Sequence, residues 1–309
     1  MLTVGKSSAE MDLTALSKVR SAPFFWRFLL YLGLVGGLAS LAAGSPSRIV
    51  AGVAMVLLGL TYTHGVELQH QTLHNTAFPS RRWNRLAGFS LGLPMLVSFS
   101  NYQHSHLRHH RLVGTAEDRE FFSYEYGRLT TLKPLVAHLL MIHHYREVIR
   151  SMGEALLGRL KPDMKRETAR RIRAEYRAMA LLVAAAVALS IAFETLVLVE
   201  IWLIPLLFAI PAHALVELPE HWGRDHASPD LRANTRTIAA GRLGAWFTNG
   251  NNYHIEHHWL PSVPNDRFPE LHRTIAAEVE AETYPAFYRR FFLELCRNTF
   301  KSRQDEATV

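Results

Sequence analysis

Cysteine is almost absent from this chain of 309 residues, since Cys296 is the only one. A single cysteine excludes an intramolecular disulfide. It also excludes the paired CxxC motifs that bind zinc or carry out thiol redox chemistry.

Several common signals are missing as well. The first twenty residues are polar and no small-residue cleavage site follows a short apolar core, so we expect no signal peptide. The formal net charge of +7 would suit a nucleic-acid partner, but no nucleic-acid-binding motif accompanies it. The sequence shows no internal repeat and no low-complexity tract.

Long apolar runs, in contrast, are present. A helix needs about 20 apolar residues to cross a bilayer, and four runs approach or reach that length: residues 24–44, 49–68, 178–193 and 196–215. Short turns join the first run to the second and the third to the fourth, which predicts two hairpins. A fifth run, 86–100, is too short to span and predicts a re-entrant or interfacial helix. We therefore predict an all-α membrane protein with four transmembrane helices, in which residues 1–309 form a single domain.

Lysine and arginine are distributed unevenly around these runs. The two hairpin turns contain only Arg48, whereas eighteen lysines or arginines lie between Gly65 and Arg177. Because positive residues are retained on the cytoplasmic side, we expect both termini to be cytoplasmic. The same rule predicts a cytoplasmic helical cap formed by 101–177 and 219–309. The alternative is a soluble helical bundle with a long apolar core, which would make the charge asymmetry a coincidence.

Histidine is abundant, with seventeen residues, and eight of them follow a regular spacing. Positions i, i+3 and i+4 share one face of a helix, so the imidazoles of each group can converge. Neutral imidazole is a common ligand of iron, zinc and copper. The three groups, which we call boxes, are His70 and His74; His106, His109 and His110; and His254, His257 and His258. The alternative for any one box is an exposed polar helix face.

The number of these histidines and the residues beside them limit the kinds of metal site that are possible. Eight imidazoles are too many for one ion, since a zinc site takes about four ligands, and they suit two ions. A zinc peptidase of the HExxH type would need glutamate where Gln71 follows His70. Few carboxylates accompany the boxes, which argues against a carboxylate-bridged di-iron bundle.

The order HxxxH, HxxHH, HxxHH on membrane hairpins resembles the membrane-bound fatty acid desaturase and hydroxylase superfamily. The resemblance extends from about Gly65 to Arg273. Four further stretches agree with it. NNYHIEHHWLPSVP (251–264) is similar to the family's third box with its two prolines, and ANTRTI (233–238) is similar to the stretch before that box in bacterial members. VGTAED (113–118) is similar to the segment after the second box. EHWG (220–223) is similar to the element that supplies a ninth histidine in alkane hydroxylases.

This resemblance implies a cytoplasmic non-haem di-iron site that uses O2 as co-substrate and two external electrons. The implied ligands are His70, His74, His106, His109, His110, His221, His254, His257 and His258. Zinc could replace iron in overexpressed protein, because the same ligands bind both. His104 is a rival for His106, but the two lie about 160° apart on a helix, so only one can face the metal. Five polar residues are candidates to hold the ring nitrogens that do not bind metal: Glu67, Asp118, Glu217, Asn251 and Glu256.

Electrons must come from a partner, because the chain has no room for a flavin domain and contains neither an HPGG haem motif nor a CxxC pair. The basic stretch 165–177 could dock an acidic donor such as ferredoxin or rubredoxin with its reductase, or anchor the chain to anionic lipid. We expect a desaturase acting on a fatty acyl or lipid chain in a bacterial inner membrane. A hydroxylase or monooxygenase with the same site is the alternative. A metal transporter is a more remote one, because transport sites lie near the bilayer midplane.

Overall fold

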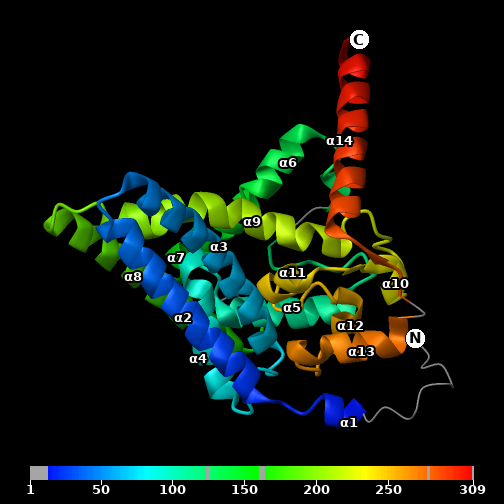
Figure 1. Cartoon of the computed structure of the whole chain (residues 1–309), viewed down its shortest axis with the longest axis horizontal. Helices are drawn as coiled ribbons and strands as arrows, with labels where there is room; N and C mark the ends of the chain where they lie inside the picture. The colour runs from blue at the N-terminus through cyan, green and yellow to red at the C-terminus, as the bar shows by residue number, and fades with distance from the viewer. Residues whose placement is uncertain (1–12, 123–125, 160–163, 277–278, 308–309) are drawn as a thin grey trace. The chain divides into compact units, whose positions relative to one another are not determined.

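A computed structural model describes residues 13–122, 126–159, 164–276 and 279–307 (Figure 1). The predicted cap also includes 123–125, 160–163, 277–278 and 308–309, which lie outside the described residues. The described chain is mostly helical and contains almost no strand, as predicted. In chain order it contains α1 (Leu13–Leu16), α2 (Ser21–Gly44), α3 (Arg48–Leu73), α4 (Arg81–Gly92), η1 (Leu93–Met95), α5 (Phe99–Leu112), η2 (Tyr126–Arg128), α6 (Leu132–Leu139), α7 (Ile142–Leu156), α8 (Arg166–Ala192), η3 (Val199–Leu203), α9 (Ile204–His221), α10 (Leu231–Asn234), β1 (Thr237–Ile238), α11 (Arg242–Phe247), α12 (His254–Trp259), η4 (Asn265–Arg267), α13 (Phe268–Ile275), β2 (Ala281–Glu282) and α14 (Tyr284–Ala307).

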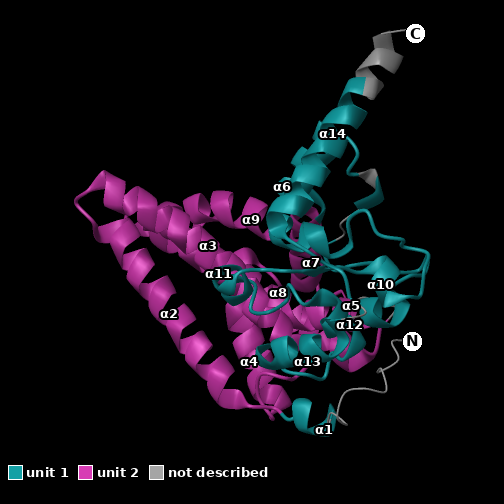
Figure 2. Ribbon diagram, turned by 45° about the vertical axis from the view of Figure 1, so that its right-hand side comes forward, with its two compact units in different colours: residues 1–18, 108–143, 214–309 teal, residues 19–107, 144–213 magenta. Residues whose placement is uncertain are grey.

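The chain divides into two compact units, coloured separately in Figure 2. Unit 1 contains residues 1–18, 108–143 and 214–309, and unit 2 contains 19–107 and 144–213. Each unit is described by itself below. The prediction of one domain over the whole chain stays a prediction.

The four predicted spans are confirmed as helices that are long and apolar enough to cross a membrane. They are α2, α3, α8 and the run Val199–His221, in which a π-helical turn, η3, leads into α9. Two of these helices extend beyond the apolar runs, because polar residues continue them at the start of α8 and at the end of α9. Which side of the membrane each end faces stays a prediction.

The predicted helix over 86–100 is interrupted. α4 ends at Gly92, a 3₁₀ turn follows, Leu96 adopts a left-handed conformation with φ 58°, and α5 begins only at Phe99. Pro94 explains part of the break, because proline cannot donate the backbone hydrogen bond of a helix interior. The freed carbonyl of Val97 accepts a 3.1 Å hydrogen bond from the Gln69 side chain. α5, which carries the second box, therefore begins as a separate helix.

Unit 2 fixes the start of α5 through one carboxylate. Glu175 on α8 accepts hydrogen bonds from Ser98 Oγ (2.7 Å), Ser100 N (2.8 Å) and Ser100 Oγ (2.5 Å). The first N–H groups of a helix have no partner within the helix, and an anion there is stabilised by the helix dipole. Asn101 also donates to the hydroxyl of Tyr176 at 3.0 Å. Two neighbouring residues of α8 thus hold the first turn of the helix that carries the second box.

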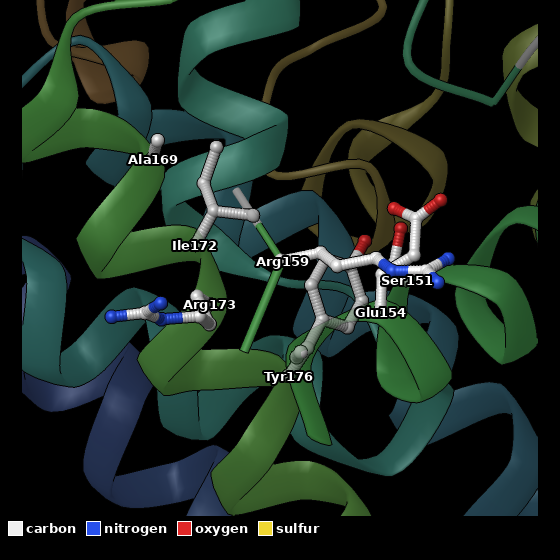
Figure 3. A pocket seen from close by; sticks show the side chains of 8 residues that line it. Ser151, Glu154, Arg159, Ala169, Ile172, Arg173 and Tyr176 are labelled. Carbon is white, nitrogen blue, oxygen red and sulfur yellow. The ribbon is translucent and has the colours of Figure 1, made fainter. Parts of the chain in front are cut away.

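The seam between α7 and α8 surrounds a small pocket (Figure 3). Arg177 Nε donates to the Ala155 carbonyl at 2.6 Å, and the Arg173 guanidinium donates to the Gly158 carbonyl at 2.7 Å. Arginines at a helix C-terminus satisfy its unpaired carbonyls and suit the negative end of its dipole. We therefore interpret the arginines in this seam as a structural joint between the two helices.

Unit 1 is built around aromatic residues of α14. Phe287, Phe291 and Leu295 recur every four residues, which places them on one helix face, and all three are buried with Trp222 of the α9–α10 connection. The Arg236 guanidinium lies 5.0 Å from the centre of the Phe287 ring. In the same unit β1 pairs in parallel with β2. This packing holds the segment between α9 and α12, which carries the last histidines.

Helices α3 and α9 lie in close contact at Gly59. A Cβ atom there would lie 2.3 Å from the Pro205 carbonyl oxygen and 2.9 Å from Phe208 Cβ. Tyr62 and Thr63 also donate to the Ile201 and Ala209 carbonyls, at 2.5 and 3.0 Å. The Ile201 carbonyl, in the π-helical turn η3, thus accepts a hydrogen bond from the Tyr62 hydroxyl although the helix is irregular there.

Gly59→Ala should therefore destabilise the protein by about 1–3 kcal/mol, the usual cost of overpacking. Thermal unfolding of the purified protein in detergent measures the effect. Gly52→Ala is the matched control, because a Cβ at Gly52, on the same helix, meets nothing within 4 Å. Equal melting temperatures for the two variants would contradict the close approach of α3 and α9.

Candidate metal centre

Three predicted ligands come together within unit 2, and we call them the trio. His70 and His74 lie at the C-terminal end of α3, and His106 lies on α5. The Nε2 atom of His106 is 2.9 Å from the Nε2 atoms of both His70 and His74. The structure therefore brings His106, and not the rival His104, into this group.

Four more come together within unit 1, and we call them the quartet: His109, His221, His254 and His258. The Nε2 atom of His254 is 3.1 Å from that of His221 and 3.2 Å from that of His258. The Nε2 atoms of His258 and His109 are 3.3 Å apart. All four side chains are buried. His221, which the sequence placed on the resemblance alone, lies in this group.

The two remaining predicted ligands form a pair within unit 1. His110 Nε2 and His257 Nε2 are 2.9 Å apart. The short helix α12 separates the third box in this way: His254 and His258 face the quartet, while His257 faces His110. All nine predicted ligands thus belong to one of three converging groups.

Polar partners fix the outer nitrogens of two quartet histidines. His109 Nδ1 lies 2.9 Å from both carboxylate oxygens of Asp118, and His221 Nδ1 lies 2.9 Å from the Asn234 carbonyl oxygen. A ring nitrogen that faces an acceptor must carry the proton, so the Nε2 of the same neutral ring presents a lone pair. Asp118 was predicted for this role. The Asn234 carbonyl was missed, because a backbone partner leaves no side-chain signal in the sequence.

The other four predicted partners have the following contacts. Glu67 Oε1 is 3.7 Å from the Nδ1 of buried His213 in unit 2. In unit 1 Asn251 accepts a 2.7 Å hydrogen bond from Asn265, and the Glu217 carbonyl accepts one of 3.4 Å from Tyr126. Buried Glu256 accepts from Thr237 at 2.6 Å and pairs with His272, so it fixes helix α12. A role for these four beside the metal stays a prediction.

Burial favours the neutral form of two of these rings, outside the membrane spans. Burial, reinforced by neighbouring imidazoles, holds the pKa of His74 and of His258 well below the usual range. For His109, burial lowers the pKa, but the Asp118 hydrogen bond and the charges of Glu120 and Asp118 raise it above its usual value. Neutral imidazoles can donate their lone pairs to a metal without first losing a proton.

The spacing of the inner nitrogens fits a metal polyhedron. With metal–nitrogen bonds of about 2.1 Å, neighbouring ligand atoms lie about 3.0 Å apart in an octahedron and about 3.4 Å apart in a tetrahedron. The Nε2–Nε2 separations between hydrogen-bonding neighbours run from 2.9 to 3.3 Å in the trio, the quartet and the pair. The donor set therefore fits a borderline divalent ion.

Two carboxylates beside the quartet were missed from the sequence. Glu120 Oε1 lies 3.6 Å from His221 Nε2, and Glu220 Oε2 lies 3.3 Å from His254 Nε2. Burial raises the pKa of Glu120 to about 7. The sequence predicts few carboxylates beside the boxes, and these two are additional to that prediction. Glu220 could have been predicted from the sequence, because it directly precedes His221. Glu120 could not, because its position near His221 depends on how the chain folds after Asp118.

Comparison with known proteins identifies the family. The model of the family described as "Fatty acid desaturase" matches residues 46–291, which include all nine histidines. The sphingolipid delta(4)-desaturase DES1 of Drosophila melanogaster is 28% identical over 235 residues, which cover 72% of this chain and 65% of that protein. The chain thus spans less than two thirds of that relative's length. With four apolar spans and three histidine boxes, this chain belongs to the fatty acid desaturase family.

Proposed function

We propose that the protein is an O2-dependent di-iron desaturase that introduces a double bond into a fatty acyl or lipid chain. Membership of the family supports a lipid desaturase or hydroxylase type of oxidoreductase. The observation that carries the finer proposal is the convergence of nine imidazoles at separations that match a metal polyhedron. Removing hydrogen from an unactivated methylene needs chemistry that no side chain supplies.

In this proposal the quartet holds one iron ion, and the trio supplies ligands for the second. His110 and His257 complete the set of nine. When bound, the two ions would supply the activation of O2. The chain's own residues hold the imidazoles in place and exclude water, since seven of the nine side chains are buried. The hydrogen bonds to Asp118 and to the Asn234 carbonyl hold two of these rings in the orientation that binding requires.

The relative's name and two sequence resemblances bear on the substrate and the product. The relative's name refers to sphingolipid desaturation, and ANTRTI with the third box resembles bacterial desaturases. Both support desaturation of a lipid chain. A hydroxylase is the second candidate, because EHWG resembles the alkane hydroxylase element and its histidine lies in the quartet. A metal transporter has little support in a chain that belongs to an enzyme family.

Electrons in this proposal come from a separate protein, such as ferredoxin or rubredoxin with its reductase. Arg166, Arg170 and Arg171 at the start of α8 are exposed and present positive charge to solvent. Such a surface accelerates the association of an acidic donor. We also propose that both termini and the metal centre face the cytoplasm of a bacterial cell, on the distribution of lysine and arginine.

His221→Ala tests the metal centre at its ninth histidine. Loss of one quartet ligand should release about one of the two ions, since only three imidazoles then remain around an ion that four hold in place. It should also abolish turnover, and elemental analysis of the purified protein measures the metal loss. His226→Ala is the control, because His226 is exposed and belongs to none of the three groups. Full metal content and normal product yield in His221→Ala would reduce the site to eight histidines.

Product analysis separates desaturation from hydroxylation. We expect expression in a host of known lipid composition to yield lipids two mass units lighter than their precursors, detected by mass spectrometry. His258→Ala should yield none, because a quartet ligand is lost while the spans remain intact. Lipids sixteen mass units heavier would instead establish the hydroxylase, and no change with an iron-loaded protein and a competent donor would refute both.

A further inference from the structure

Helix α6 of unit 1 buries one apolar face and exposes another. Leu135 is buried in the cluster that α6 shares with the aromatic residues of α14. Leu132 and Val136, with Leu140 directly after the helix, are spaced four residues apart and are 51–53% exposed. An apolar stripe at this spacing normally faces a core. Large apolar side chains that gather on a surface instead mark a site of interaction.

The neighbouring helix α14 exposes an aromatic residue in the same part of unit 1. α6 and α14 share one buried cluster, and Figure 2 shows them side by side. Phe292 of α14 is 46% exposed, and the centre of its ring lies 6.1 Å from that of Tyr288. We call these exposed apolar residues the α6–α14 surface: Leu132, Val136, Leu140 and Phe292.

Both helices are attached to one turn of α9. His138 Nε2 on α6 lies 3.1 Å from the Ala214 carbonyl oxygen, and the Tyr288 hydroxyl on α14 donates to the Leu215 carbonyl. Ala214 and Leu215 end the apolar run 196–215. At about 1.5 Å per residue this run is about 30 Å long, which is the thickness of the hydrocarbon of a bilayer. α6 and α14 are therefore attached where α9 leaves the hydrocarbon.

Basic side chains accompany the apolar ones. α6, with the sequence LKPLVAHL, contains Lys133 and no acidic residue, and Lys133 is exposed. On α14, exposed Arg289 lies three residues before Phe292 and thus on the same face, whereas exposed Glu294 lies about 200° away from Phe292. Long basic side chains lay their methylenes along an apolar layer and extend their charge to lipid phosphates. An apolar face with lysine and arginine beside it is typical of a helix in the membrane interface.

We propose that the α6–α14 surface lies in the membrane interface, on the side where the C-terminal end of α9 emerges. Its four apolar side chains enter the boundary of the acyl chains, and Lys133 and Arg289 contact lipid phosphates. A second copy of the chain would also bury an apolar surface. Lipid is the occupant we infer, because both helices are attached at the end of a span, where lipid already surrounds the protein. This inference depends on the apolar spans and not on the metal centre.

Collisions of a spin label with oxygen and with a nickel chelate test this position, because oxygen concentrates in hydrocarbon and the chelate stays in water. The full-length protein would carry Cys296→Ser, which removes its only cysteine, and either Val136→Cys or Phe292→Cys labelled with a nitroxide. In vesicles of phosphatidylcholine and phosphatidylglycerol, both labels should show a ratio of oxygen to nickel collisions several-fold above that of a control label. Ala227→Cys is the control, because it replaces an exposed residue of unit 1 outside this surface.

Two results would overturn the proposal. Labels at Val136 and Phe292 that meet nickel as often as the label at Ala227 would place the surface in water. Labels shielded from both reagents, with spin–spin broadening that unlabelled protein removes on dilution, would show that a second copy of the chain covers it. If the cysteine variants fail to fold, wild-type protein in vesicles that contain a lipid with a photoreactive diazirine in its acyl chain decides the matter. Cross-links should fall within 132–140, and their absence there, with cross-links present in α2, would contradict the proposal.

Discussion

Buried imidazoles whose lone pairs face one another are the constraint on which the rest of this structure depends. His109 and His221 direct their outer nitrogens at Asp118 and at the Asn234 carbonyl, so the inner nitrogens of these rings, when neutral, present lone pairs to the quartet. Removing such groups from water is costly unless a partner replaces the lost hydration. A metal ion is that partner, and the surrounding helices must hold the rings in place before it arrives.

The way each box is held differs with the length of its helix. α5 has 14 residues and begins at a carboxylate clamp from Glu175. α12 has only 6 residues, which is too short to be stable alone. Glu256, fully buried on α12, compensates through its contacts with Thr237 and His272. Each of these two helices is thus ordered by a carboxylate. For α5 it is Glu175 of α8, and for α12 it is Glu256, which lies next to the predicted ligand His257.

The sequence predicted the features that repeat locally. Apolar length identified the four spans, and histidine spacing at i, i+3 and i+4 identified eight of the nine converging residues, because both patterns are set within one helix. His221 was identified by the resemblance of EHWG alone. The sequence did not predict the break between Gly92 and Phe99 or the contacts of Glu120 and Glu220. The break depends on Gln69 reaching the Val97 carbonyl, and the carboxylates depend on chain segments that meet only after folding. Residue spacing within one helix does not reveal contacts between segments that are far apart in the sequence.

X-ray absorption and elemental analysis of the active protein test the central claim most directly. We expect two iron ions per chain, each surrounded only by nitrogen and oxygen donors at about 2.0–2.2 Å, with the scattering pattern of several imidazoles. Iron content should fall together with activity when a chelator removes the metal. Full activity in protein with less than about one iron per chain, or a sulfur donor at iron, would contradict the histidine-based centre.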